Sequence, residues 1–213
     1  MLGLSVASFI TRAITLVIAF SVHEFAHAWT ATKLGDDTPR LNGRLTLNPL
    51  SHLDPFGSLL LLVTGFGWAK PVPVNPYALR RRTPAGMMRV SAAGPASNLL
   101  LAILAAIPFR AGWVTSFSTG NSLLPTAGGF LVEFIFINLI LLFFNLIPVS
   151  PLDGEKVVEY FLPPSGQDFL VRIRPYGPLI LIALVFLGQF GRFDLLGTLI
   201  GTPAMRVLSL LVS

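Results

Sequence analysis

Apolar runs that follow one another along the chain restrict its fold more than any other feature of the sequence. Hydrophobic residues make up 53% of the 213 residues, charged residues make up 12%, and the mean hydropathy is +0.73. A soluble globular domain carries roughly 25% charged residues. The composition therefore predicts an integral membrane protein, and the length suits one compact domain, residues 1–213, without a second sizeable domain.

The apolar runs predict an all-α polytopic membrane protein with about four to five transmembrane helices. The first run includes residues 13–20 and ends in a polar cluster. The later runs predict two full spans, a short span, and a last helix that either spans the membrane or lies at its surface, at about 90–109, 130–147, 177–190 and 195–211. We expect the core of the domain at 12–157 and the C-terminal helices at 176–213.

The chain changes character between Lys33 and Arg89, where Asn-Gly, Asn-Pro and Asp-Pro pairs interrupt it too often for a long helix. Residues 44–47 fit a short strand, and the apolar run 56–68 is too short for a span. We therefore predict a re-entrant or short β-hairpin segment between the first two spans. Irregular backbone at membrane depth must be covered by protein or water, so this segment should line a cavity beside the first helix.

Ionisable residues interrupt the end of the first apolar run. His23 and His27 are four residues apart, so a helix places both on one face, within reach of a single metal ion. Glu24 projects beside them. This is the H-E-x-x-H arrangement, in which two neutral imidazoles bind zinc and the carboxylate accepts a proton from water. Ionisable residues are costly in lipid, so we interpret the cluster as functional.

Asp153 is the candidate for the third protein ligand that a catalytic zinc ion requires. It follows the third predicted span, after Pro148 and Pro151 have ended the regular helix, and the adjacent Gly154 permits unusual backbone dihedrals. An isolated Asp-Gly pair usually marks only a turn. The presence of the two histidines favours the ligand, and we predict one Zn²⁺ per chain.

Three further polar-site candidates have competing explanations. Gly94 and Asn98 are four residues apart in the second span, where small residues let helices approach closely, and packing alone explains Gly94. The Asn98 amide needs a partner, either in a substrate or at the metal site. His52 lies in a turn-rich segment, and we expect a supporting role rather than metal ligation because Asp153 already completes the site.

The basic residues predict the orientation in the membrane. They fall between the apolar runs and form no basic-aromatic face, so no nucleic-acid binding is expected despite the net charge of +5. Eight of the fifteen Lys and Arg lie between residues 33 and 89, and three more lie between 156 and 174. The positive-inside rule makes this side cytoplasmic. We expect a multi-pass plasma membrane protein with the metal site near the cytoplasm and the N-terminus outside.

A secretory signal peptide is the alternative for the first apolar run. Arg12, the run itself and Ala26-His27-Ala28 imitate the three regions of such a peptide. Cleavage there would remove both histidines and leave Asp153 without partners, so a retained helix explains more of the sequence. The chain has no cysteine, which excludes disulfides and cysteine-ligated zinc.

Several separated motifs between about residues 20 and 157 carry a resemblance to a known family. They are His23-Glu24-Phe25-Ala26-His27, Gly94-x-x-x-Asn98, Asn145-x-x-Pro148 with Leu152-Asp153-Gly154, and the stretches 44–49, 52–57 and 68–75. With these motifs the chain resembles the site-2 protease family of intramembrane zinc metalloproteases, and in particular its small branch without PDZ or CBS domains.

The resemblance implies that His23, His27 and Asp153 bind zinc. It also implies that Glu24 is the catalytic base and that Asn145 helps to hold the substrate or the oxyanion. The sequence shows neither the PDZ nor the paired CBS domains of larger members, and no separate span before the H-E-x-x-H helix. Regulation by those modules is therefore not expected.

Three functions fit these residues. The first is a zinc endopeptidase that cuts a transmembrane helix of another protein, with the lipid bilayer and a transmembrane protein substrate as its partners. The second is a metal or proton transporter, which would spread its ligands along a path rather than concentrate them at one depth. The third is a catalytically silent membrane scaffold, which has no need of Glu24.

A protease of this kind must hold its substrate unwound, because a helical substrate hides its amides in its own hydrogen bonds. The irregular stretch 41–74 is the candidate, with Leu45 and Leu47 as substrate-binding residues that pair with an extended peptide by strand addition. A purely structural connector is the competing interpretation.

Overall fold

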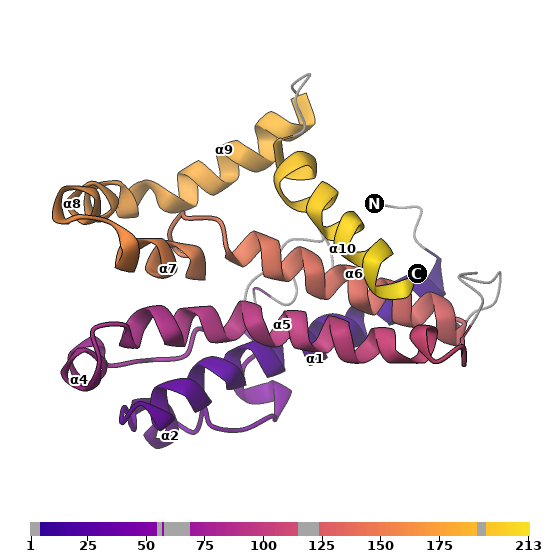
Figure 1. The fold of residues 1–213 in the computed structure, drawn as a ribbon, viewed down its shortest axis with the longest axis horizontal. Helices are drawn as coiled ribbons and strands as arrows, with labels where there is room; N and C mark the ends of the chain where they lie inside the picture. The colour runs from indigo at the N-terminus through magenta and orange to yellow at the C-terminus, as the bar shows by residue number, and fades with distance from the viewer. Residues whose placement is uncertain (1–4, 55–56, 58–68, 115–123, 191–194) are drawn as a thin grey trace.

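Three long apolar helices form the body of the protein. The computed structural model describes residues 5–54, 57, 69–114, 124–190 and 195–213. Within these residues, α1 (Val6–Lys33), α5 (Gly86–Arg110) and α6 (Ala127–Asn145) are long and apolar enough to cross a membrane. They lie side by side, with α5 in contact with both other helices (Figure 1). The predicted helical architecture is thereby confirmed, with three helices that could span a membrane.

The C-terminal apolar runs form shorter helices. The α9 helix (Gly177–Phe190) has 14 residues, about 21 Å of helix, against a hydrocarbon core about 30 Å thick. The π-helical η3 (Gly197–Gly201) continues into α10 (Thr202–Val212), and together they make one shorter apolar helix. Spans beyond the first three therefore stay predictions.

The main apolar core lies between α5, α6 and α10. Small side chains on α5 and α10 let the larger side chains of α6 pack closely against both helices. The buried residues of this core are Ala102, Ala106, Phe109, Ile135, Leu139, Leu142, Ala204 and Leu208. The Arg12 side chain forms an ion pair with Glu133, 2.6 Å between Nε and Oε1, which joins α1 to α6.

The connection from α1 to α5 is irregular, as predicted, but residues 44–47 form no strand, and residues 45 and 46 are bends. It contains α2 (Thr38–Leu41) and η1 (Pro49–Ser51), and the backbone of Leu53 pairs with that of Ala69 in an isolated antiparallel bridge. The strand prediction is wrong because local bonds hold this stretch: the Thr46 hydroxyl accepts from the backbone of Asn48 at 3.1 Å. The predicted re-entrant run 56–68 lies outside the described residues except for Gly57.

A buried carboxylate fixes the last part of this connection beside α1. Asp36, 2% exposed, accepts hydrogen bonds from the backbone N–H groups of Thr38, at 3.0 Å, and Asn75, at 2.6 Å. Asn75 in turn caps α4 (Pro76–Arg82), because its side chain accepts from the first N–H groups of that helix. This chain of bonds sets where α4 lies relative to the end of α1.

Two amphipathic helices follow α6 that the apolar pattern did not predict. They are α7 (Asp153–Phe161) and α8 (Pro164–Ile173), followed by the 3₁₀ turn η2 (Arg174–Tyr176). Asp153 is therefore the first residue of a helix and not part of a turn. Gly154 is helical too. A glycine is required here because a Cβ atom would lie 2.6 Å from the carbonyl oxygen of Ile147. The prediction that Gly154 supplies unusual dihedrals is wrong.

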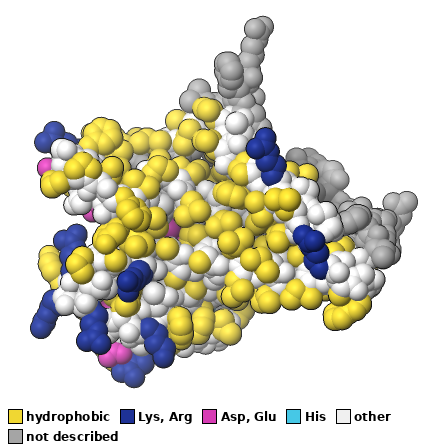
Figure 2. Space-filling view, in the orientation of Figure 1, with side chains coloured by type: hydrophobic (Ala, Val, Ile, Leu, Met, Phe, Trp, Pro, Cys, Tyr) yellow, Lys and Arg dark blue, Asp and Glu magenta, His cyan; other side chains and the backbone are white. Residues whose placement is uncertain are grey.

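Charged and apolar side chains are separated along the molecule. Hydrophobic side chains cover most of the face in Figure 2, and Lys and Arg gather at the end where α4 and α8 lie. The apolar part corresponds to the three long helices, as expected for a protein surrounded by lipid.

Candidate metal centre

Two helices that are distant in sequence bring three ligands together. His23 and His27 lie one turn apart on α1, and Asp153 begins α7. The Asp153 Oδ2 atom lies 3.2 Å from Nε2 of His23 and 3.3 Å from Nε2 of His27. The histidines are 6% and 8% exposed. Among the described residues, this is the one group of three or more His, Cys, Asp or Glu side chains that is arranged to hold a metal ion.

These distances fit the edges of a zinc tetrahedron. Zinc binds imidazole nitrogen and carboxylate oxygen at about 2.0–2.2 Å, so two ligand atoms at the tetrahedral angle lie about 3.3 Å apart. The Oδ2 atom is buried and, although it is this close to both nitrogens, has no hydrogen-bond partner in the described part of the protein. These two nitrogens and one oxygen lie close together with no hydrogen bond between them, and their lone pairs are suited to bind a cation.

The other nitrogen of each imidazole is already occupied. Nδ1 of His23 lies 2.7 Å from Oδ1 of Asn98, and Nδ1 of His27 lies 2.7 Å from the backbone carbonyl of Val90. Both partners are acceptors, because the Asn98 amide nitrogen donates to Asn138 at 3.0 Å. Each Nδ1 must therefore carry the hydrogen, which leaves the Nε2 lone pairs facing Asp153. Such partners orient metal-binding histidines and raise their basicity.

The carboxylate of Asp153 is ionised at neutral pH. Burial raises the pKa of this group, and positive charge beside it lowers the pKa, to about 2 when the imidazoles of His27 and His23 are protonated; a metal ion bound in place of those protons would act in the same direction. A carboxylate must be deprotonated to bind a metal. Asp153 therefore brings a negative charge to a site whose other two ligands are imidazoles.

Gly94 on α5 provides the space in which the two imidazoles lie. A Cβ atom at this position would be 2.5 Å from both Cε1 and Nε2 of His23, and would also collide with Nε2 of His27. Gly94 therefore serves close packing, as predicted, but the groups that pack against it are the imidazoles of His23 and His27.

Glu24 lies next to the ligands and is 8% exposed. The buried side chain of Arg44, 4% exposed, lies within electrostatic reach: burial lowers the pKa of Arg44, and the charge of Glu24 opposes this change. The guanidinium donates from Nη2 to the carbonyl of Lys70, while its Nε has no partner among the described residues. Arg44 therefore bonds within the irregular segment and lies within electrostatic reach of Glu24.

The remaining predicted site residues lie in different surroundings. Asn98 is fully buried and contacts His23, the second of its two predicted kinds of partner. Asn145 ends α6, and its amide donates to the carbonyl of Leu141 at 3.0 Å. Leu47 is 56% exposed in the irregular segment, and Leu45 is half-buried there. Their proposed contacts with substrate stay predictions.

His52 is fully buried and is not among the three grouped ligands. Its Nε2 lies 2.7 Å from the carbonyl of Thr46, and its own carbonyl accepts from the N–H of Lys70 at 2.8 Å. His52 thus bonds within the irregular segment, and a supporting role at the metal site stays a prediction.

Sequence reasoning missed the residues that support the histidines. Val90 acts through its backbone carbonyl, which no side-chain pattern reveals. Asn138 could have been noticed as an amide in the middle of an apolar run, where it needs a partner. It is fully buried, and it holds Asn98 through Oδ1 while donating from its own amide to the carbonyl of Phe134 at 2.9 Å.

Comparison with known proteins supports this interpretation of the site. The chain is 42% identical over 188 residues to a Bacillus subtilis protein named "Putative zinc metalloprotease YwhC", covering 85% of this chain and 82% of the relative. The chain belongs to the site-2 protease family. Two proteins named "Putative zinc metalloprotease Rip2" are also similar: that of Mycolicibacterium smegmatis is 32% identical over 83% of this chain and 67% of the relative, and that of Mycobacterium tuberculosis H37Rv is 33% identical over 79% and 63%.

No family model matches the chain, and no solved structure matches it. The names of the similar proteins support a metalloprotease function and imply zinc as the metal of this site-2 protease family member. The group His23, His27 and Asp153 supplies residues of the right kind to bind it.

Proposed function

We propose that this protein is an intramembrane zinc endopeptidase that hydrolyses peptide bonds within or near the transmembrane segments of other proteins. The observation that carries the proposal is the position of the ligand group: two of its three members and Glu24 lie on α1, a helix long and apolar enough to cross the membrane. A hydrolytic centre on such a helix can reach a peptide bond at membrane depth.

The residues have distinct roles in the proposed reaction. Zinc held by His23, His27 and Asp153 would make a water molecule more acidic and polarise the carbonyl of the substrate. Glu24 accepts the proton of the attacking water and passes it to the leaving nitrogen. Asn145, at the end of α6, is proposed to hold the substrate or the oxyanion.

The irregular segment is proposed to hold the substrate unwound. Its Arg44 side chain lies within electrostatic reach of Glu24, and its Leu47 side chain is exposed. Free backbone groups near Leu45 and Leu47 are proposed to pair with an extended peptide. A Gly-Pro pair inside the substrate helix should then speed cleavage, because it lowers the cost of unwinding.

We propose that the protein lies in the plasma membrane with the basic end in the cytoplasm and the N-terminus outside. The separation of basic and apolar side chains supports this orientation. It places the metal centre toward the cytoplasmic end of α1, where water has access.

Cleavage by purified protein tests the proposal. The wild type and Glu24→Gln are reconstituted into vesicles with single-span model proteins that carry a Gly-Pro pair in the membrane helix, and the fragments are identified by mass spectrometry. We expect cleavage within or next to the helix by the wild type, inhibition by a zinc chelator, and no cleavage by Glu24→Gln, which keeps its zinc. Cleavage of none of these proteins, or equal cleavage by both variants, would contradict the proposal.

A transporter would give a different result in the same vesicles. A transporter needs further ion-binding groups along the membrane. Arg12 and Glu133 are charged residues of the described spans, but they form an ion pair with each other. Arg12 lies about 16 Å along α1 from His23, so this pair does not continue the ligand group into a series along the helix. Zinc uptake that depends on His23, without cleavage, would favour transport.

A further inference from the structure

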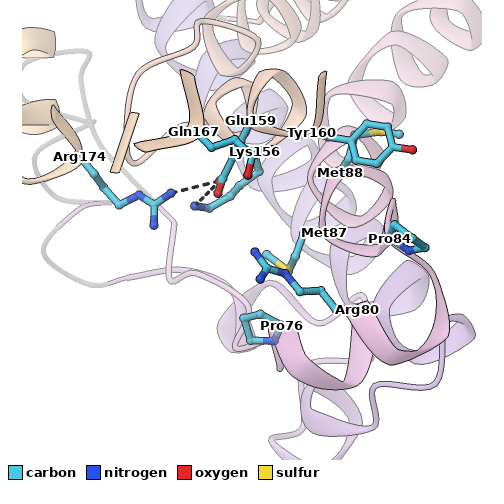
Figure 3. A pocket seen from close by; sticks show the side chains of 10 residues that line it. All are labelled: Pro76, Arg80, Pro84, Met87, Met88, Lys156, Glu159, Tyr160, Gln167 and Arg174. Atoms are coloured by element: carbon cyan, nitrogen blue, oxygen red, sulfur yellow. Dashed lines mark hydrogen bonds and ion pairs between the residues drawn. The ribbon is translucent and has the colours of Figure 1, made fainter. Parts of the chain in front are cut away.

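A pocket of about 570 Å³ opens between the start of the α4–α5 unit and the α7–α8 pair (Figure 3). Pro76, Arg80 and Met87 belong to one wall, and Lys156, Glu159 and Arg174 to the other. In Figure 3 the two walls face each other, with Tyr160 beside Met88 at one side.

The pocket adjoins the metal centre. Met87 lies three residues before Val90, whose carbonyl holds His27, and Lys156 lies three residues after Asp153. Three residues of helix correspond to about 4.5 Å. Both walls are thus one turn away from residues of the metal centre, at the end of the molecule where basic side chains gather. A polypeptide that leaves the centre toward this end passes the pocket.

The wall formed by α7 and η2 is electrically balanced. Lys156 lies 3.2 Å from Glu159 and 3.6 Å from Glu155, and Arg174 lies 2.5 Å from Glu155 and 3.1 Å from Glu159. Two cations and two carboxylates neutralise one another here, and Glu155 is only 3% exposed. This network fixes the shape of the wall and contributes no net charge to the pocket.

Arg80 on the facing wall is therefore the source of excess charge. In the part of the chain that the structure describes, its guanidinium has no ion pair, and it lies in the last turn of α4. The pocket has a net positive charge, with Tyr160, Met87 and Met88 offering apolar contact. This combination suits an extended peptide that carries carboxylates.

We propose that this pocket binds an acidic segment of the substrate that flanks its transmembrane helix on the basic side of the membrane. The proposal rests on the proposed protease function and names the substrate class. A lipid phosphate would also carry negative charge. However, α5 and α7 contribute both to the walls of the pocket and to the metal centre, so we assign the pocket to the chain that is cleaved there.

A charge exchange tests the pocket. Two model substrates share one membrane helix and differ only in a flank rich in Glu or rich in Lys, in vesicles of phosphatidylcholine alone. We expect the wild type to cut the Glu-flanked substrate with roughly fivefold higher kcat/KM, the size of one exposed ion pair. Arg80→Glu should reverse the preference. Arg82→Glu, the same change on the same helix outside the pocket, should keep it.

Two outcomes of this comparison would overturn the proposal. In one, Arg80→Glu keeps the preference for the acidic flank. In the other, Arg82→Glu alters it as much as Arg80→Glu does, which would indicate a general surface charge. If adding anionic lipid to the vesicles removes the wild-type preference while raising cleavage through Arg80, the occupant is a lipid phosphate and the proposal fails.

A cross-link tests the pocket without any activity. The chain has no cysteine, so single cysteines report one position each. In the Glu24→Gln background and with a copper-phenanthroline oxidant added, Met88→Cys should form a disulfide with a cysteine in the acidic flank, and Tyr77→Cys, which is 80% exposed outside the pocket, should not. Failure of the Met88→Cys link, or equal linking at both positions, overturns the proposal. If no substrate is cut at all, the protease function fails, and the cross-link still decides about the pocket.

Discussion

His23 and His27 each use one ring nitrogen to bind the protein and leave the other for a metal. The two partners differ: a side-chain amide from Asn98 and a backbone carbonyl from Val90. Both come from α5, so a single neighbouring helix fixes the orientation of both imidazoles. This arrangement makes the metal centre sensitive to residues that never touch the metal.

Removal of a ligand should remove the metal. His23→Ala, His27→Ala and Asp153→Ala should each lower zinc from about one per chain to a small fraction of it, because three protein ligands are needed. Glu24→Gln should keep its zinc. The measurement is elemental analysis of purified protein. A full zinc content in Asp153→Ala, together with loss of zinc in His52→Ala, would show that Asp153 is not the third ligand.

Loss of the amide that holds His23 should weaken metal binding without removing a ligand. Asn98→Ala should lower zinc affinity by about 10- to 100-fold, the usual effect of such a partner. Asn98→Asp keeps the accepting oxygen and should lose less. Competition with a chelator measures the affinity. Asn145→Ala is the control, because its amide bonds within its own helix; equal affinity in Asn98→Ala and wild type would contradict the prediction.

A single methyl group at Gly94 should displace the imidazoles. Gly94→Ala places a carbon 2.5 Å from His23 Nε2, so we expect at least a tenfold loss of zinc affinity and a destabilisation of about 1–3 kcal/mol from overpacking. Gly201→Ala is the matched control, since a Cβ there meets nothing within 4 Å. Thermal unfolding and chelator competition distinguish the two. Normal zinc affinity in Gly94→Ala would exclude the close contact.

The sequence predicts the long helices from local patterns, but it does not predict the contacts between helices. The spacing of His23 and His27 fixes their common face within one helix, and long apolar runs identify α1, α5 and α6. The α7 helix escaped prediction because it is short, amphipathic and preceded by prolines. The bond between Asn98 and Asn138 joins two helices 40 residues apart, and no local rule pairs them.

The irregular segment between α1 and α5 gives a prediction of its own. Leu45→Pro or Leu47→Pro removes a backbone donor and should abolish cleavage of a membrane substrate while zinc content and folding stay intact. Leu45→Ala and Leu47→Ala keep the donor and should cleave nearly normally. Fragment analysis and zinc content are measured together. Normal cleavage by the proline variants, or failure with loss of zinc, would show that this segment does not hold the substrate.

Basic side chains are distributed unevenly along the whole molecule and gather at the end where α4 and α8 lie. The positive-inside rule predicts that single cysteines at Ser51, Thr83 and Ser165 react with an impermeant reagent from the cytoplasmic side, and that one at Ser118, which lies outside the described residues, reacts from the opposite side. The absence of natural cysteines makes each label specific. Labelling of Ser118 and Thr83 from the same side of sealed vesicles would contradict this topology.

Because Asp153 is the first residue of α7, a metal bound to it would fasten that helix to α1 across more than half of the chain. The free energy of metal binding is then also free energy of assembly for the α7–α8 pair, since the ligands come together only when these helices are in place. The same pair forms one wall of the pocket beside Arg80. A bound metal would therefore both complete the centre and hold the wall of the pocket formed by α7 and α8 close to α1.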